Sequence, residues 1–152
     1  MNDYSDFEKG ADTSERLGPA RAAAQGWLSV DEIKCGAYLS LILATCIGVY
    51  LIWIAGLPIF YLGVASLISA IAYTAGPWPL AYLGLGDLFV MIFFGFGAVA
   101  GTYYVQTLHW HPALWSCGWS VGAIATCILV VNNLRDHQSD RHAKKRTLAV
   151  RF

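Results

Sequence analysis

The fold is decided by residues 36–55, which read GAYLSLILATCIGVYLIWIA. This apolar run has about 20 residues, the length that an α-helix needs to cross the roughly 30 Å hydrocarbon core of a bilayer. The pair Ser29 and Glu32 matches a capping box, so we expect the helix to begin near Val30 and to continue into the membrane. Residues 1–34 are mostly polar and are predicted to lie outside the membrane.

Charged residues are concentrated at the two ends of the chain. Only 13% of the 152 residues are charged and 57% are apolar, whereas a soluble domain carries about 25% charged residues. All ten Lys and Arg lie within 9–34 or 135–151, and Asp87 is the single charged residue from 35 to 134. One charge cannot make so long a segment soluble. The sequence therefore predicts an all-α, polytopic membrane helical bundle.

Four segments are apolar and long enough to be membrane helices. We expect these helices at 36–55, 57–75, 88–106 and 113–133. The third contains Gly97 and Gly101 in a G-x-x-x-G pattern, which allows close contact between membrane helices. Residues 75–87 are rich in Pro and Gly and predict a structured loop. We expect Asp87 to cap the helix that follows.

Four membrane helices place three polar segments on one side of the membrane. These segments are residues 1–34, the loop 75–87 and residues 134–152. The two connections on the opposite side carry no Lys or Arg. Because positively charged segments are retained in the cytoplasm, we expect the polar side to be cytoplasmic.

Two acidic clusters fall on this side. Asp136 and Asp140 follow Asn132 at i+4 and i+8, so a helix that continued outward from the membrane would place the three in one column. Acids at a helix C-terminus oppose the helix dipole, which favours a functional explanation over a structural one. Asp3 and Asp6 form the second cluster. Oxygen ligands of this kind suit a hard cation such as Mg²⁺ shared with a phosphate.

Basic and aromatic residues accompany the acids. Four cations follow the second cluster: Arg141, Lys144, Lys145 and Arg146. They are either positive-inside anchors or ligands of a diphosphate beside the metal, and Arg21 is a further candidate for the second role. Tyr73 is either an interfacial aromatic residue or part of an aromatic substrate's pocket. The combination favours Mg²⁺-assisted loss of diphosphate from a substrate whose apolar tail lies between the helices.

These residues resemble the motifs of the UbiA-type intramembrane prenyltransferases. Asn2 to Asp6 is similar to the later part of the family's N-x-x-x-D-x-x-D motif, and Asp136 to Asp140 is similar to its D-x-x-x-D motif. The similarity is greater to the branch that prenylates 1,4-dihydroxy-2-naphthoate in menaquinone synthesis. Three blocks carry it: residues 2–12, residues 73–77 with 84–87, and residues 131–151.

The resemblance implies transfer of a polyprenyl group from its diphosphate to 1,4-dihydroxy-2-naphthoate, with loss of CO₂ and diphosphate. It implies that Mg²⁺ is bound, directly or through water, by catalytic aspartates. These are Asp3, Asp6, Asp136 and Asp140. The substrate-binding residues that it implies are Asn2, Asn132, Lys145, Arg146, Arg21, Tyr73 and Asp87.

The resemblance also sets the expected context of the chain. Members of the family have about nine membrane helices, so we expect this chain to be an internal piece with four of them, inactive by itself. Met1 falls inside the first motif. The implied location is the cytoplasmic (inner) membrane. The implied partners are the polyprenyl diphosphate, the aromatic acceptor and the lipid bilayer, and we expect no nucleic acid partner.

Two alternatives stay open. Another aromatic prenyltransferase of the superfamily, such as one acting on 4-hydroxybenzoate, would share the acid clusters and differ in residues 73–87. A noncatalytic helical bundle, such as part of a transporter, would place polar residues at mid-membrane, where the predicted helices carry only scattered Ser, Thr and Cys. A CDP-alcohol phosphotransferase is disfavoured because its D-G-x-x-A-R motif is absent.

Overall fold

The computed structural model describes residues 2–8, 18–74 and 79–152. Within these ranges the chain is helical and contains no strand, which confirms the predicted fold class. The helices are α1 (Asn2–Glu8), α2 (Val30–Ala55), α3 (Leu57–Ala72), α4 (Gly86–Val90), η1 (Met91–Gly97), α5 (Ala98–Thr107), α6 (Ala113–Arg135), α7 (His137–His142) and α8 (Leu148–Arg151). Helices α4, η1 and α5 follow one another without a break and form one long helix.

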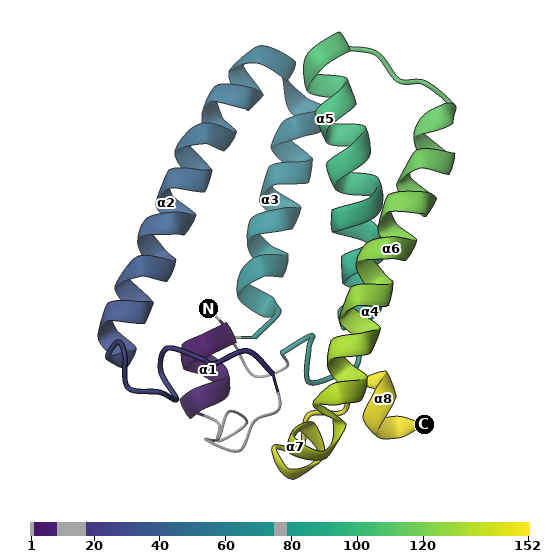
Figure 1. The fold of residues 1–152 in the computed structure, drawn as a ribbon. Coiled ribbons are helices and arrows are strands. Elements are labelled where there is room, and N and C mark those ends of the chain that lie inside the picture. Colours follow the sequence, from purple (N-terminus) through teal and green to yellow (C-terminus); the bar gives the residue numbers. More distant parts are fainter. Residues whose placement is uncertain (1, 9–17, 75–78) are drawn as a thin grey trace.

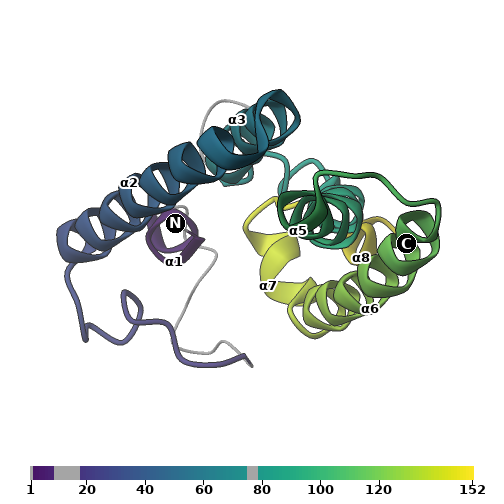
Figure 2. The same ribbon diagram turned by 90° about the horizontal axis from the view of Figure 1, so that it is seen from above.

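The long helices form a curved row, and the short helices gather at one end of it. Seen from above, α2, α3, α5 and α6 follow one another, with α1 and α7 on the concave side (Figure 2). Helices α1, α7 and α8 lie together with both chain ends (Figure 1). The polar segments from the two ends of the sequence therefore share one side of the bundle, as predicted.

Three helices are long and apolar enough to cross a membrane: Val30–Ala55, Gly86–Thr107 and Ala113–Arg135. Helix α3 is shorter. Its 16 residues measure roughly 24 Å at 1.5 Å per residue, less than the ~30 Å hydrocarbon core. The predicted segment 57–75 thus ends as a helix at Ala72, and a fourth crossing stays a prediction.

The predicted start of the first membrane helix is confirmed. The Ser29 hydroxyl accepts a hydrogen bond from the Glu32 backbone N–H at 3.3 Å, and Glu32 Oε2 accepts one from the Ser29 backbone N–H at 2.7 Å. This capping box satisfies backbone donors that the first turn leaves free. At the other end, Gly56 has a φ of 72°, which a glycine adopts readily. It turns the chain directly into α3.

The predicted G-x-x-x-G contact is also confirmed. A Cβ atom at Gly101 would lie 2.6 Å from Leu62 Cδ2 of α3, and one at Gly97 would lie 3.3 Å from Leu62 Cδ1. The absence of side chains at these two positions allows α3 to approach. Small residues serve this purpose in membrane bundles, where packing replaces the hydrophobic effect.

A second glycine contact was not predicted. A Cβ atom at Gly95 would lie 2.7 Å from both the Gly118 carbonyl oxygen and Gly122 Cα. Helix α6 therefore packs backbone to backbone against η1. The seven residues of η1 form a π-helix, in which hydrogen bonds reach one residue further than in an α-helix. Apolar periodicity in the sequence predicted an ordinary helix here.

Two local predictions are wrong. Asp87 does not cap the third helix, because the N-cap is Leu85 and Asp87 lies within the first turn. The second acid motif does not continue as one helix either. Helix α6 ends at Arg135, and Asp136, with φ −92° and ψ 7°, separates it from α7. The spacing survives the break, since the backbone N–H of Asp140 still donates to the Asp136 carbonyl at 2.9 Å.

Candidate functional site

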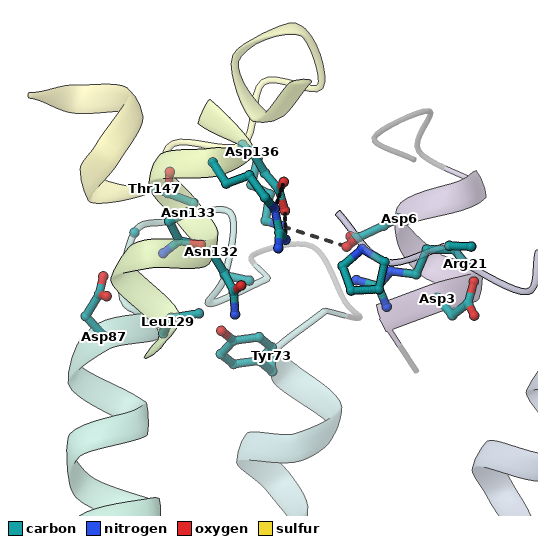
Figure 3. Close-up of a pocket in the computed structure, with 17 residues that line it drawn as sticks. Asp3, Asp6, Arg21, Tyr73, Asp87, Leu129, Asn132, Asn133, Asp136 and Thr147 are labelled. Atoms are coloured by element: carbon teal, nitrogen blue, oxygen red, sulfur yellow. Dashed lines mark hydrogen bonds and ion pairs between the residues drawn. The ribbon is translucent and has the colours of Figure 1, made fainter. Parts of the chain in front are cut away.

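A polar pocket of about 500 Å³ lies at the end of the bundle that carries α1, α7 and α8 (Figure 3). Its lining comes from both ends of the sequence and from the loop before α4. Eight of the predicted site residues line it: Asp3, Asp6, Arg21, Tyr73, Asp87, Asn132, Asp136 and Lys145. The fold therefore brings together residues that the sequence separates by more than a hundred positions.

Asp3 anchors α1 to the segment before α2. Its carboxylate accepts hydrogen bonds from the backbone N–H groups of Ala22, at 3.1 Å, and Ala23, at 3.3 Å. Two residues further on, the Ser5 hydroxyl donates to the Thr74 carbonyl at 3.0 Å. These bonds fix the N-terminal cluster against the end of α3, although α1 itself has only seven residues.

Lys145 connects the two acid clusters. Its Nζ atom lies 3.7 Å from Asp6 Oδ2 and 3.5 Å from Asp140 Oδ1. The two carboxylates are thus well within the ~10 Å that two metal ions bridged by phosphate oxygens require. Tyr82 completes the contact, because its hydroxyl donates to Asp6 Oδ1 at 3.1 Å and its ring lies 5.6 Å from Lys145 Nζ.

Asp140 is buried behind the pocket lining and is only 5% exposed. Burial raises the pKa of its carboxyl above the ordinary value, because an apolar environment disfavours the charged form. Lys145 opposes this rise in pKa, whereas the negative charges of Asp136 and Asp6 add to it. Asp140 is therefore a carboxylate whose charge depends on a cation nearby.

Asp136 is paired with its neighbour in the chain. Arg135 donates from Nε to Asp136 Oδ1 at 2.7 Å and from Nη2 to Oδ2 at 2.8 Å. This two-point geometry is the strongest form of the Arg–carboxylate pair. The Arg135 guanidinium also lies against Gly18, where a Cβ atom would lie 2.7 Å from Nη2. Each cluster of aspartates is thus paired with a basic side chain of the protein.

One predicted site residue is placed differently, and the prediction for another is not tested. Arg146 does not line the pocket, and its side chain is exposed. Its backbone N–H donates to the Tyr82 carbonyl at 3.0 Å, so it ties the C-terminal segment to the loop before α4. Asn2 begins α1, but its side chain lies outside what the structure describes. The same holds for the whole of residues 75–78, the first part of the predicted loop.

Three polar residues of the pocket lining were not among the predicted site residues: Asn133, Arg135 and Thr147. Asn133 adjoins the predicted Asn132, so its place beside the site was available from the sequence. Arg135 and Thr147 flank the second acid motif and carried no signal of their own. A lone threonine after a run of cations has no spacing that distinguishes a pocket residue from a surface residue.

We expect Lys145→Gln to destabilise this end of the molecule. Gln fills similar space but leaves Asp6 and Asp140 without their shared cation. We call the longer protein that contains this chain the full polypeptide. In it, the free energy of unfolding should fall by about 1–3 kcal/mol. This is below the 3–5 kcal/mol of a tight buried pair, because the Nζ–oxygen distances exceed 3 Å.

Thermal unfolding in detergent, without divalent cations, measures this effect. The matched control is Lys144→Gln, which removes one cation from an exposed neighbouring side chain. Equal melting temperatures for the two variants would show that Lys145 does not stabilise the juxtaposed carboxylates.

The oxygen atoms of this pocket are suitable ligands for a hard divalent cation, which prefers carboxylate and amide oxygens. Among the residues that the structure describes, no three His, Cys, Asp or Glu side chains lie close enough to hold a metal ion. Lys145 and Arg135 lie between or against the carboxylates instead. The donor atoms are of the kind that a divalent cation binds, and in this structure the two basic side chains are paired with them.

An apolar pocket of about 610 Å³ adjoins the polar one. It lies between α3 and the long helix α4–η1–α5 and is lined by Ser66, Ser69, Ala70, Tyr73, Phe89, Val90, Phe93, Phe94 and Ala98. Tyr73 lines both pockets, and in Figure 3 its ring lies below the acid clusters. A ligand with an anionic head and an apolar tail could occupy the two pockets at once.

Known proteins resemble this chain along almost its whole length. The UbiA prenyltransferase family matches the chain over residues 1–152. The chain is 43% identical to a 1,4-dihydroxy-2-naphthoate octaprenyltransferase of Haemophilus influenzae and 39% identical to one of Escherichia coli, over 99% of the chain and 51% of each relative. It is 32% identical to UbiA prenyltransferase domain-containing protein 1 of Dictyostelium discoideum, over the whole chain and 48% of that protein.

The chain thus spans about half the length of these curated relatives. No solved structure gives a significant match to it.

Proposed function

Because the chain belongs to the UbiA prenyltransferase family, we propose that the protein containing it transfers a polyprenyl group from its diphosphate to 1,4-dihydroxy-2-naphthoate, with release of CO₂ and diphosphate. The relatives whose names state this acceptor support the choice. The family and the long apolar helices make the chain part of an integral membrane protein, and we propose the lipid bilayer as the partner of these helices.

The observation that carries the proposal is the junction of the two pockets at Tyr73. One pocket is lined by carboxylates, cations and amides, and the other is almost entirely apolar. A polyprenyl diphosphate has the same two-part character. Its diphosphate would lie among the side chains around Lys145, and its first isoprene units would pass Tyr73 into the space between α3 and η1.

Members of this family generally use a divalent metal, and we propose Mg²⁺. The residues that would hold it are Asp3, Asp6, Asp136 and Asp140, with Asn132 in support. When bound, the metal neutralises negative charge on the departing diphosphate, so that the allylic carbon can ionise. Asp6 and Asp140 already lie on either side of one cation, Lys145, which supports their sharing another.

The cationic side chains would hold the diphosphate. Lys145 and Arg21 line the pocket, and each can donate charge-assisted hydrogen bonds to phosphate oxygens. Arg146 lies just outside and would need to turn inward to join them. Tyr73 and Asp87 would contact the aromatic acceptor on the side of the pocket away from Asp3, and Asn2 would support the first aspartate motif.

The acid clusters would face the cytoplasm. The eight Lys and Arg that the structure describes belong to segments at this end of the bundle, and such segments remain on the cytoplasmic side of the cell membrane. Protease accessibility of a tag beside residue 152 in sealed inner-membrane vesicles would locate this end.

Prenyl transfer in membranes containing the full polypeptide tests the proposal. With Mg²⁺ and a polyprenyl diphosphate, we expect prenylation of 1,4-dihydroxy-2-naphthoate with CO₂ release, little or no reaction with 4-hydroxybenzoate, and complete loss of product when EDTA removes the metal. Membranes lacking the protein are the control. Product from 4-hydroxybenzoate alone would make the acceptor wrong, and product that persists in EDTA would make the role of the metal wrong.

A further inference from the structure

Lys145 is fixed at the end of α7 by a Schellman motif, a common way for a helix to end. Its backbone N–H donates to the Asp140 carbonyl at 2.8 Å, and the backbone N–H of Lys144 donates to the Arg141 carbonyl at 3.2 Å. Lys144 has the positive φ, 57°, that this motif requires. The motif brings the chain back against the third residue from the helix end. Lys145 therefore lies beside Asp140 because of the local fold.

The loop before α4 holds Lys145 from the other side. The next residue, Arg146, donates its backbone N–H to the Tyr82 carbonyl at 3.0 Å. The Tyr82 ring lies 5.6 Å from Lys145 Nζ, and an aromatic ring attracts an ammonium group at this distance. The backbone of Lys145 is thus anchored on both sides, whereas its four-carbon side chain can change conformation without moving the backbone.

The ammonium group of Lys145 lies among nearly buried charges. Its Nζ atom is 3.7 Å from Asp6 Oδ2 and 3.5 Å from Asp140 Oδ1, and the side chains of Lys145, Asp6 and Asp140 are 16%, 5% and 7% exposed. Little water screens these charges, so each acts strongly on the others. Both distances exceed the ~2.7–2.9 Å of a tight charge-assisted hydrogen bond. The ammonium group is therefore held loosely enough for another cation to replace it.

We propose that Lys145 competes with the divalent cation for Asp6 and Asp140. This inference rests on the proposed function, in which both carboxylates hold the metal. A metal ion bound to these two carboxylates would lie close to the ammonium group, and like charges repel strongly where so little water screens them. The metal alone therefore binds weakly, because it must first displace Lys145.

The diphosphate removes this obstacle. Its oxygen atoms offer the ammonium group of Lys145 other acceptors for charge-assisted hydrogen bonds, so Asp6 and Asp140 become available to the metal. The metal and the diphosphate then each strengthen the binding of the other, as any two coupled ligands must. The consequence is that the site holds its metal tightly only while a diphosphate is present.

Binding of Mn²⁺ to the full polypeptide in detergent tests the competition. Mn²⁺ takes the same kinds of oxygen ligand as Mg²⁺, and the intensity of its EPR signal reports the unbound ion. Without diphosphate, we expect Lys145→Gln to bind Mn²⁺ about tenfold or more tightly than the unmutated protein, an effect of the size usual for coupled binding. Loss of a residue that only stabilises the fold would not strengthen metal binding.

Two variants are matched controls. Lys144→Gln removes the same charge from an exposed side chain one residue away, and Lys145→Arg keeps a positive charge beside the carboxylates. Both should bind Mn²⁺ within about threefold of the unmutated protein, since an exposed charge acts weakly. Adding inorganic pyrophosphate, at equal concentrations of free Mn²⁺, should remove most of the difference between Lys145→Gln and the unmutated protein.

A second measurement uses the unmutated protein and so does not depend on the folding of a variant. Saturating Mn²⁺ without diphosphate should make Lys145 react severalfold faster with an acetylating reagent, as read by mass spectrometry, because the metal drives its ammonium group away from the carboxylates. Lys34 is the internal control. It is paired with Glu8 at 2.6 Å and does not line the polar pocket, so its rate of acetylation should not change.

Three results would overturn the inference: Lys145→Gln binding Mn²⁺ no more tightly than Lys144→Gln, Lys145→Arg binding it as tightly as Lys145→Gln, or Mn²⁺ leaving the acetylation of Lys145 unchanged. A difference in Mn²⁺ affinity that persists in pyrophosphate would make the role of the diphosphate wrong. No prenyl substrate is used in these measurements. Failure of prenyl transfer to 1,4-dihydroxy-2-naphthoate, with the gain in Mn²⁺ affinity intact, would contradict the proposed function and not the competition.

Discussion

Replacing Asp140 with Asn in the full polypeptide is expected to lower kcat for prenyl transfer by about a hundred- to a thousandfold, the usual effect of removing one group that stabilises charge in a transition state. Asn has nearly the same shape as Asp and keeps an oxygen, but it lacks the negative charge. Asp140 lies 3.5 Å from the cation that joins the two acid clusters. In the proposed function, its charge would lie beside a metal that neutralises the diphosphate.

Stability should hardly change in the same variant. Because burial already raises the pKa of Asp140, the charged form is disfavoured there, and a neutral amide fits at little cost. Lys145 retains Asp6 as a partner. The pair of measurements is the rate of product formation at saturating substrate and the melting temperature, with Asp31→Asn as the control. A rate within threefold of the control would rule out Asp140 as a residue that acts on the diphosphate or its metal.

Replacing Gly95 with Ala should have the largest effect on folding. The new Cβ atom would meet the Gly118 carbonyl oxygen and Gly122 Cα, both at 2.7 Å. Neither is the flexible end of a side chain, so α6 itself would have to move away from η1. We expect a loss of about 3 kcal/mol, at the upper end of what overpacking usually costs, and a melting temperature lower by several degrees.

Gly36→Ala is the matched control for that experiment. A Cβ atom at Gly36 meets nothing within 4 Å in the described structure, and the residue lies inside α2. Alanine there should stabilise the helix by up to about 1 kcal/mol. The two variants add the same methyl group, so they differ only in what it contacts. Equal melting temperatures would mean that the close approach of η1 and α6 does not limit stability.

Much of the fold followed from where the charges are. With Asp87 as the single charge from 35 to 134, only apolar membrane helices were possible for that region, and the capping box at Ser29 located the first of them. The π-helix and the Gly95 contact did not follow. A glycine that faces a partner helix has the same place in the sequence pattern as one that faces lipid, since both faces are apolar.

Most of the charged residues of the site were predicted, whereas Arg135 and Thr147 were missed. Asp3, Asp6 and Asp136 were placed in one pocket because spacing and topology put them on one side of the membrane. Thr147 was not, because its place in the pocket arises from burial beside a loop that is more than fifty residues away in the chain. The position of Lys145 between Asp6 and Asp140 could not be predicted either, because it depends on how the two ends of the chain meet in the fold.

The π-helix η1 rotates the faces of α5 about the helix axis relative to those of α4. In an uninterrupted α-helix, Asp87 and Gly101 would lie only about 40° apart around the axis, since each residue advances 100°. The wider turns of η1 advance less per residue, so α5 is rotated with respect to α4. One half of the helix can then direct Asp87 into the pocket, while the other half directs Gly101 at Leu62. The face of α5 that packs against α3 is therefore not tied to the face of α4 that lines the pocket.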